Sequence, residues 1–481
     1  MAPGVLWGDS GDAQVRVLTG AWTDARELAR THVTYYAVAI GLHRLVGLEA
    51  ALAANLVSAL AGVVTVANVC CLLTGFVRRR LAVVCCGALL LCSHTLWQLS
   101  TGAEVVTFST MLLSFELVLL TRFARTAHPG WLALAALANG LGWSTHNYAM
   151  LTWPAYAIVA AMNVRRLPKP GTLLLVGGAW VVGCLPLFIA AGCEYQRVGS
   201  VTGTVNSLLF GVYRDKVFNH DVSAGLVVRQ FAYLGLNFPT PVILLSGWGW
   251  WRARSLGPRG LWVWFTVAGL TFAVFGMRYN VPDQYTFLVH AYVFIVVFAA
   301  IGVDHWLGRF PSAPMRVAVV ALSLTGPVVY AMAPMLLRDA AWTQRFMPAR
   351  DVPYRDSYTW LLRPWRAGYH GAERYAREVF EVLPPDAVLL AGDTVRRPLV
   401  YLQIRDGVRP DVRISTGRRD PLGRQAVVMT PADALDYAGR GRLFSTGRNA
   451  GYAPSWLFQD GYRFEPIGHV YRVRAAEPER R

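Results

Sequence analysis

Charged side chains are scarce in this chain: only 16% of its 481 residues are Asp, Glu, Lys or Arg, whereas 54% are hydrophobic. Apolar runs of roughly 18 residues or more are typical of membrane-spanning helices, and about ten such runs lie before residue 337. The composition therefore excludes a soluble enzyme and predicts a polytopic, mainly α-helical membrane protein. The expected spans are 51–77, 81–99, 103–121, 130–144, 147–163, 171–192, 226–250, 260–276, 285–303 and 314–336.

Cysteine pairs with metal-binding spacing are also lacking. The seven Cys lie in or beside apolar runs and none forms a CxxC pair, so we interpret them as small packing residues rather than as disulfides or metal ligands. The stretch GDT at 392–394 lacks the GK[ST] ending of a phosphate-binding loop. These motifs therefore predict neither a metal centre nor a nucleotide site.

Basic residues are in excess, with a formal net charge of +17, but their distribution argues against nucleic-acid binding. Thirteen lie in every second connection between the expected spans, and only four lie in the other connections. Under the positive-inside rule the first set is cytoplasmic, which places the N-terminus and the segment after residue 337 on the outer side. The thirteen are Arg78, Arg79, Arg80, Arg122, Arg125, Arg165, Arg166, Lys169, Arg252, Arg254, Arg259, Arg309 and Arg316.

The first fifty residues contain no expected span. Residues 1–30 lack the apolar core of a signal peptide, and since the topology places them outside, we expect a first membrane helix upstream of the given start. Residues 31–47 are short and interrupted by His and Arg, so an interfacial helix is expected there, with Tyr35 and Tyr36 at the headgroup level. The loop 193–225 is long and polar enough to cover the outer face.

A small soluble α/β domain is expected after the last span, which divides the chain into 1–337 and 338–481. Short strand-like runs stand between turn signals, and the stretch beginning LPPDAVLLAGDTV has the pattern of a strand, a turn and a helix. The topology places this domain on the outer side. The strand-like runs are 387–393, 425–430 and 469–473.

Two carboxylates, Asp9 and Asp12, stand three residues apart among small residues in the stretch WGDSGD. Glycine and serine let backbone and substrate approach closely. An acid kept at the mouth of a membrane domain is a candidate functional group. The alternative interpretation is a surface turn or a helix N-cap.

Further polar residues converge on the same side of the expected membrane. Each has a structural alternative: His146 could be a turn histidine with satisfied hydrogen bonds, and Glu104 an acid favoured by its position at a helix N-terminus. Because four separate stretches meet on one side, we predict a polar cavity that opens outward beneath the soluble domain. Its members are Asp9, Asp12, His32, Glu104, His146, Asn147, Arg278 and Asp283.

Two ionisable residues lie deeper in the expected bundle. Glu116 is about 18 Å farther along its helix than Glu104, and His290 lies within the ninth span. Buried acids in spans can mark proton relays, which would favour a transporter. Since no longer chain of such groups accompanies these two, we prefer hydrogen bonding between helices.

The stretch APGVLWGDSGD, followed by a His-containing helix, resembles the first outer loop of the GT-C membrane glycosyltransferases and, more narrowly, of the bacterial relatives of protein O-mannosyltransferases. The chain departs from that family in two ways. Residues 32–35 read His-Val-Thr-Tyr where the family usually has His-Pro-Pro-Gly, and the family usually has a helix before the acidic loop. The resemblance covers most of the chain, continuing through 55–66, 96–113, 140–148, 279–303 and 383–414.

The resemblance implies an enzyme that transfers a sugar, with mannose as a candidate, from a polyprenyl-phosphate donor to a protein, polysaccharide or lipid acceptor at the outer side of the cytoplasmic membrane. The family's catalytic base is an Asp of the outer loop, which Asp9 matches best and Asp12 second. An inverting transfer needs one carboxylate to take the proton of the acceptor hydroxyl while the lipid phosphate leaves from the opposite face. The leaving phosphate needs cationic or hydrogen-bonding partners.

On this basis Glu104 would orient the acceptor or tune the base, and Arg278 is the first candidate partner of the phosphate, ahead of Arg229 and His146. The sequence requires no metal, although some members of the wider fold use one, so a divalent ion stays open. The rival hypotheses are a transporter or lipid flippase, and a non-catalytic scaffold of the cell envelope. The other expected substrate-binding residues are His32, Tyr35, Asn147 and Asp283.

Overall fold

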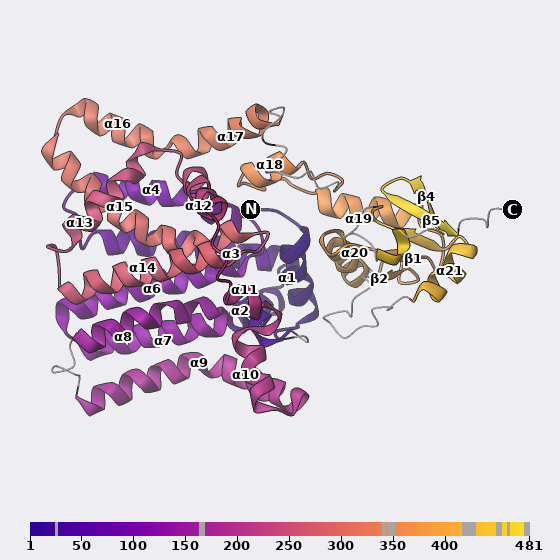
Figure 1. The fold of residues 1–481 in the computed structure, drawn as a ribbon, viewed down its shortest axis with the longest axis horizontal. Helices are drawn as coiled ribbons and strands as arrows, with labels where there is room; N and C mark the ends of the chain where they lie inside the picture. Colours follow the sequence, from indigo (N-terminus) through magenta and orange to yellow (C-terminus); the bar gives the residue numbers. More distant parts are fainter. Residues whose placement is uncertain are drawn as a thin grey trace.

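The chain folds into a bundle of long helices followed by a smaller part in which helices accompany a sheet (Figure 1). Helix α17 (Thr325–Leu337) is the last of the bundle, and the next α-helix in the described part of the chain is α18 (Ser357–Leu362). The computed structural model describes residues 1–24, 27–162, 169–338, 343, 352–415, 430–448, 455–458 and 462–475.

Five segments of the described residues are long and apolar enough to cross a membrane. Each has at least 20 residues, which at about 1.5 Å per residue cover the hydrocarbon thickness of a bilayer. Two bent pairs of helices raise the number to seven if each pair is one span: α4 (Arg80–Leu91) with α5 (His94–Ser100), bent by 61°, and α16 (Ala313–Ser323) with α17, bent by 44°. The five are α3 (Ala50–Leu73), α6 (Val105–Thr126), α9 (Pro170–Val198), α14 (Arg259–Arg278) and the segment Gln284–Arg309, which contains η6 (Gln284–Leu288) and α15 (Val289–Arg309).

The expected fold class, a polytopic helical bundle with a small α/β part, is confirmed. Apart from the bent pairs, three of the ten expected spans, 130–144, 147–163 and 226–250, contain only shorter helices. A break between two helices leaves the hydropathy of an apolar run high, so hydropathy alone does not reveal it. Near Pro239 and Pro241, for example, the missing amide donors end one helix before the next begins. The shorter helices are α7 (Pro129–Thr145), η2 (Asn147–Thr152), α8 (Trp153–Met162), α12 (Ala224–Asn237), η5 (Pro241–Leu244) and α13 (Leu245–Ala253).

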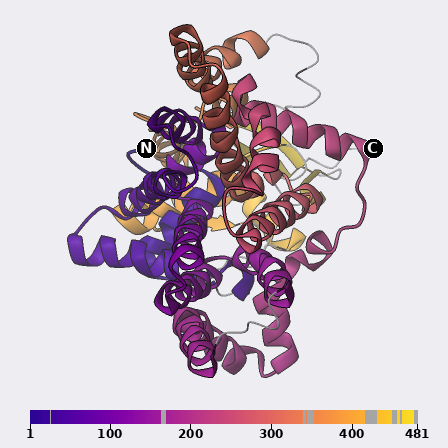
Figure 2. The same ribbon diagram turned by 90° about the vertical axis from the view of Figure 1, so that its left-hand side faces the viewer.

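Helix α15 forms the centre of the bundle and α9 its edge. In the most apolar part of each span, 89% of the residues are buried in the segment that contains α15, but only 22% are buried in α9. The α15 side chains belong to the largest apolar cluster of the protein, together with residues of α4, α6 and α14. In the view turned by 90°, the helices of the bundle are seen closer to end-on, with the sheet-containing part behind them (Figure 2).

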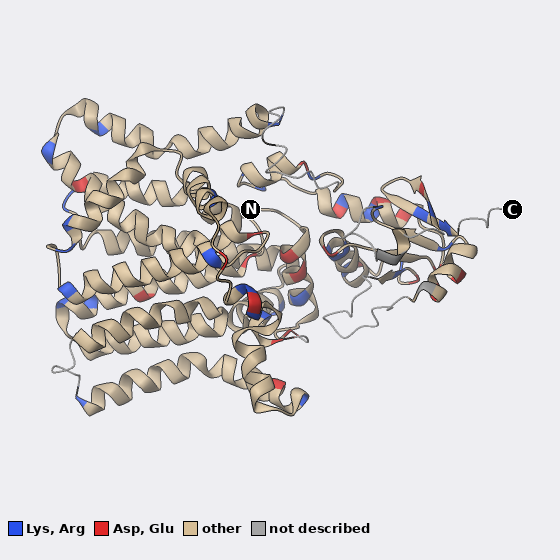
Figure 3. Cartoon of the chain, in the orientation of Figure 1, with Lys and Arg blue, Asp and Glu red and all other residues tan. Residues whose placement is uncertain are grey.

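Charged residues gather at the ends of the bundle, and its middle is almost free of them (Figure 3). Lys and Arg residues mark the end on the left of the figure, opposite the sheet-containing part. This distribution is the one expected of helices that cross a hydrocarbon layer.

The other end of the bundle, on which the sheet-containing part lies, is called the docked end here. Helix α2 matches the short helix expected at 31–47. The loop after α9 packs on η1, because the Leu28 amide donates to Ser207 Oγ at 2.9 Å and the Val212 amide donates to Glu27 Oε2 at 2.6 Å. The short elements of the docked end are α1 (Gly8–Thr19), η1 (Leu28–Arg30), α2 (Val33–Val46), α10 (Val201–Leu209), η4 (Gly211–Tyr213) and α11 (Arg214–Val217).

The C-terminal sheet has five strands in the order β2-β1-β3-β5-β4. The first three are parallel, with Val388 paired to Arg413 and Leu443, whereas β5 is antiparallel to β3 and β4. The strand, turn and helix expected from residue 383 onward are present as β1 and α20, and the strand expected at 469–473 is present as β5; the one expected at 425–430 lies mostly outside the described residues. The elements are α19 (Gly371–Val382), β1 (Val388–Leu390), α20 (Asp393–Asp406), β2 (Arg413–Ser415), α21 (Pro431–Gly439), β3 (Leu443–Ser445), η8 (Ser455–Phe458), β4 (Tyr462–Ile467) and β5 (Val470–Ala475).

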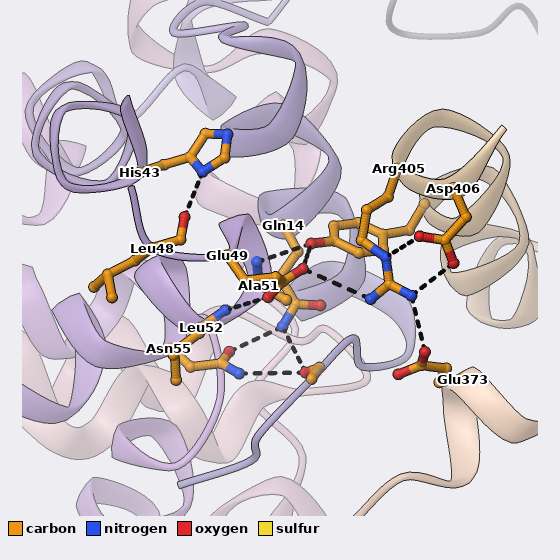
Figure 4. A network of polar contacts seen from close by, with 12 residues as sticks. Gln14, His43, Leu48, Glu49, Ala51, Leu52, Asn55, Glu373, Arg405 and Asp406 are labelled. Atoms are coloured by element: carbon orange, nitrogen blue, oxygen red, sulfur yellow. Dashed lines mark hydrogen bonds and ion pairs between the residues drawn. The ribbon is translucent and has the colours of Figure 1, made fainter. Parts of the chain in front are cut away.

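Polar contacts join this part to the bundle (Figure 4). Glu49 caps α3 by accepting from the Leu52 amide at 2.9 Å, and it also lies 3.8 Å from Arg405 of α20. Arg405 in turn pairs with Glu373 of α19 at 2.8 Å. Helices from both parts of the chain therefore share one network of ion pairs and hydrogen bonds.

Candidate active site

The stretch that carries the two N-terminal acids begins helix α1 at the docked end. Gly8 has a φ of 57°, a left-handed conformation that glycine adopts without a steric penalty. Gln14 Oε1 accepts from the Leu6 amide at 2.8 Å, and Gln14 Nε2 donates to Asn55 Oδ1 of α3 at 2.9 Å. These buried bonds hold the first turn of α1, which contains Asp9, against the bundle.

Asp9 and Asp12 have different surroundings although they lie on one helix. Asp9 is exposed, and no described residue forms a hydrogen bond or an ion pair with its side chain. Asp12 is buried, and its Oδ1 lies 2.5 Å from Nη1 of Arg397 in α20. Of the two, only Asp9 presents an unoccupied carboxylate to solvent.

The protein crowds around the Asp9 carboxylate, and this desolvation raises the pKa of Asp9 above its ordinary value of 3.8. Among the neighbouring charges, that of Arg30 opposes the shift most strongly, and that of Asp12 adds to it. Arg30 ends η1, and its guanidinium forms no hydrogen bond or ion pair with any residue in the described part of the chain. A cation without a partner therefore lies near the exposed acid.

A second carboxyl group, that of Glu104, precedes the first turn of α6. Its Oε1 accepts from Ser10 Oγ at 2.8 Å, and its amide donates to Ser58 Oγ of α3 at 2.8 Å. Burial, followed by the charge of Asp9, raises the pKa of Glu104 to about 8, and the charge of Asp283 adds to the shift. Glu104 is therefore mostly protonated at neutral pH and can donate a hydrogen bond there.

Two imidazoles of the predicted cavity stack on each other. The ring centroids of His32 and His146 are 5.1 Å apart, and their planes are inclined by 16°. His32 Nδ1 lies 2.8 Å from the Thr145 carbonyl and so carries the proton, whereas His146 Nδ1 accepts from the Tyr148 amide at 3.2 Å. Burial lowers the pKa of His146 to about 4 and that of His32 well below its ordinary value. Both rings are therefore neutral near pH 7.

Two of the expected substrate-binding residues make bonds inside the protein. Tyr35 is fully buried, and its hydroxyl donates to the Ala54 carbonyl at 3.1 Å. Asn147 donates through Nδ2 to the Leu208 carbonyl of α10 at 2.8 Å. Through these bonds both side chains join secondary-structure elements of the docked end.

The arginines chosen from the sequence are also engaged elsewhere. Arg278 donates through Nε and Nη2 to the Asn219 carbonyl, at 2.8 and 2.6 Å. Arg229 is exposed on α12 and donates to Asn280 Oδ1 at 3.3 Å. Asp283 is exposed, and its charge reaches Glu104, so it lies near the cluster.

Two residues near Asp9 were not predicted from the sequence, Arg30 and Tyr213. Burial raises the pKa of Tyr213, whose neighbours include Arg30 and Asp9, so the tip of the loop after α10 lies close to both. Arg30 stands only two residues before His32, a predicted site residue, so its position in the sequence could have marked it as a candidate. Arg30 lies before the first expected span, whereas the arginines predicted from the sequence lie in or beside the later spans.

The polar residues inside the bundle form a separate network. Asn139 Nδ2 donates to both oxygens of Glu116 at 3.3 Å, and the Tyr156 hydroxyl donates to the same carboxylate. His290 Nε2 lies 3.1 Å from Ser109 Oγ. Glu116 and His290 both line a cavity of about 10 Å³, which has room for a single water. The arrangement is the interhelical hydrogen bonding preferred from the sequence.

No group of three or more His, Cys, Asp or Glu side chains able to hold a metal ion occurs in the part of the chain that the structure describes. The described side chains at the docked end offer an exposed carboxylate, a protonated carboxyl group, neutral imidazoles and a guanidinium without a partner among them.

Comparison of the sequence with protein-family models and with curated proteins returns no match. The fold does have counterparts among solved structures. The crystal structure of ArnT from Cupriavidus metallidurans bound to undecaprenyl phosphate aligns with a TM-score of 0.57 and 16% identity, over 99% of this chain and 96% of that chain. The apo form of the same protein aligns with a TM-score of 0.57 and 15% identity over the same shares.

The archaeal oligosaccharyltransferase AglB from Archaeoglobus fulgidus, in complex with an inhibitory peptide and a dolichol-phosphate, aligns with a TM-score of 0.48 and 11% identity, over 100% of this chain and 72% of that chain. The similarity to ArnT covers nearly the whole length of both chains. The protein therefore has the GT-C fold, as its sequence predicted. The narrower relation to protein O-mannosyltransferases stays a prediction.

Proposed function

We propose that this protein is a membrane glycosyltransferase, which moves a sugar from a polyprenyl-phosphate donor to an acceptor hydroxyl at the docked end of the bundle. The observation that carries the proposal is that the charge of Arg30 acts on an exposed Asp9, while neither side chain has a hydrogen-bond or ion-pair partner among the described residues. The fold adds support, because the ArnT structure of the same fold holds undecaprenyl phosphate.

In the proposed reaction Asp9 accepts the proton of the acceptor hydroxyl as that oxygen attacks the sugar. The bond from the sugar to the lipid phosphate breaks, and the phosphate leaves with the bonding electron pair. Arg30 balances the charge of the leaving phosphate, a role in which a guanidinium can form two parallel hydrogen bonds. Protonated Glu104 donates a hydrogen bond within the same cluster. Because it is neutral, it adds no negative charge beside the base.

The membrane orientation, the sugar and the acceptor are proposed mainly from the sequence. The sparing use of basic residues in the connections of the docked end supports an outward orientation in the cytoplasmic membrane, with residues 338–481 as an outer domain. Mannose is the first sugar to test, with protein and glycan acceptors compared. Because α20 packs on the helix that carries Asp9, we assign acceptor recognition to the C-terminal domain.

The proposal is tested by Asp9→Asn in protein purified into lipid nanodiscs. With labelled polyprenyl-phosphate mannose and envelope acceptors, transfer should fall on the order of 1,000-fold, since an amide cannot accept the proton. Binding of undecaprenyl phosphate should stay at the wild-type affinity. The matched control is Asp215→Asn, which removes an exposed carboxylate of α11 and should leave transfer unchanged.

Wild-type transfer by Asp9→Asn would overturn the assignment of the base. If the wild-type protein transferred no sugar from polyprenyl-phosphate mannose or glucose, and a deletion strain kept a normal envelope glycan profile, the glycosyltransferase proposal itself would fail.

A further inference from the structure

One face of α20 runs along the docked end of the bundle. Arg397, Tyr401 and Arg405 are spaced four residues apart and so lie in one row on the helix. Tyr401 accepts through its hydroxyl from the Ala51 amide of α3 at 2.9 Å and donates to Glu49. This row is called the α20 row below.

The first contact of the row is the ion pair between Arg397 and Asp12. Both side chains are almost fully buried, with 6% and 9% of their surfaces exposed. The two helices cross closely at this point, because a Cβ added to Gly11 would lie 2.7 Å from Cβ of Arg397 and 2.4 Å from the Leu6 carbonyl oxygen. A buried ion pair is costly to break from one side, since the remaining charge stays in a poorly solvated place.

The pair stands one helical turn after Asp9. Asp9 and Asp12 lie one turn apart on a short helix, so a displacement of Asp12 also displaces Asp9. The cap residue of α1, Trp7, makes no side-chain hydrogen bond to the helix. Contacts from outside α1 therefore decide where its first turn lies.

We propose that Arg397 is a positioning residue for the catalytic base: through its buried ion pair with Asp12, the C-terminal domain sets the place and the charge environment of Asp9. The inference rests on the proposed function, in which Asp9 is the catalytic base. It gives the C-terminal domain a part in the reaction that does not depend on which acceptor is used.

The charges around Asp9 make the inference testable. They come from Arg30 of η1, Asp12 of α1, and Arg397 and Asp393 of α20, while Glu104 of α6 feels the charge of Asp9 in return. The Arg397 charge lowers the pKa of Asp9, and the Asp12 charge raises it. Removal of either partner breaks the same ion pair, but the two removals shift the pKa of Asp9 in opposite directions.

The experiment follows the Asp9 carboxyl directly. A carbodiimide reacts with protonated carboxyl groups, so mass spectrometry of labelled Asp9 against pH gives the midpoint of its protonation in the intact protein. In Arg397→Gln this midpoint should move to higher pH, and in Asp12→Asn to lower pH. Both variants should lower kcat with polyprenyl-phosphate mannose by about 10- to 100-fold, because a small displacement of a catalytic group is enough for such a loss.

Three further variants separate positioning from folding. Arg397→Lys keeps the charge and should retain more of kcat than Arg397→Gln. The double variant Asp12→Asn with Arg397→Gln leaves two amides that can bond to each other, and should recover part of the loss. Arg405→Gln is the matched control: it removes an arginine of the same row two turns away, and should leave kcat and the Asp9 midpoint unchanged.

Unchanged kcat in Arg397→Gln and Asp12→Asn would overturn the inference, as would midpoints that move in the same direction. If Arg397→Gln does not fold, Arg397→Lys and Asp12→Asn decide the question. Opposite midpoint shifts in a protein that transfers no sugar would leave the positioning of Asp9 standing and remove the proposed function instead.

Discussion

The protein has two groups of polar residues, one at the docked end and one inside the bundle, built from the same residue types. Inside, Glu116 accepts from Asn139 and Tyr156, and His290 is bonded to Ser109. At the docked end, Asp9 has no hydrogen-bond or ion-pair partner within the described residues. Glu116 and His290 thus each have side-chain partners on neighbouring helices, whereas Asp9 has none among the described residues and faces solvent.

The difference shows that burial alone does not identify a functional acid. Glu116 is the more deeply buried carboxylate, but its partners and a cavity with room for one water account for it without a substrate. Asp9 combines solvent access with a pKa raised first by desolvation and then modified by nearby charges, and perturbed pKa values of this kind are common at functional sites.

The largest effect is expected at Arg30. Changing Arg30→Gln should lower kcat/KM for polyprenyl-phosphate mannose by about 100-fold, because the leaving phosphate loses its charged partner. Binding of undecaprenyl phosphate, measured in nanodiscs, should weaken as well. Arg278→Gln is the matched control: this guanidinium already donates to the Asn219 carbonyl, so its loss should affect transfer much less. A larger effect at Arg278 than at Arg30 would restore the assignment made from the sequence.

The next effect is a pH dependence set by Glu104. With a pKa of about 8, its carboxyl group is neutral below that pH and ionised above it. Ionised Glu104 would repel both Asp9 and the leaving phosphate, so kcat/KM should fall as the pH rises through that value. Glu104→Gln stays neutral and should lose this alkaline decline, whereas Asp215→Asn should keep it. An alkaline decline that persists unchanged in Glu104→Gln would exclude Glu104 as its cause.

The smallest effect is expected inside the bundle. Glu116→Gln keeps an oxygen that can accept from Asn139 or Tyr156, so transfer should be unchanged and the melting temperature in detergent only slightly altered. Loss of the cellular phenotype in Glu116→Gln, together with full activity of Asp9→Asn, would favour the transporter hypothesis over the enzyme.

Much of the fold could be predicted from the sequence, because apolar runs and turn residues act locally. The spans, the short helix at 33–46 and the strand-turn-helix unit at 388–406 all follow from such patterns. The lengths of single helices could not be predicted, since the 61° bend between α4 and α5 depends on packing and leaves the hydropathy high.

The candidate site was partly predictable for the same reason. The stretch around Asp9 and the residue Glu104 stand out as acids at the ends of apolar segments. Partners are set by the tertiary structure: nothing in the sequence shows that Asp12 meets Arg397 from 385 residues away in the chain, or that Arg278 is held by the Asn219 carbonyl. Arg30 is a candidate because its charge lies near Asp9, and this proximity is set by the tertiary structure.

Two titrations of one preparation can decide whether Asp9 is the base of a reaction at the docked end. The first is the acidic limb of kcat/KM for polyprenyl-phosphate mannose, and the second is the pH midpoint of carbodiimide labelling at Asp9. If Asp9 is the base, the two midpoints should coincide, above the ordinary pKa value of 3.8. Clearly separated midpoints, or an acidic limb that persists in an active Asp9→Asn protein, would contradict it.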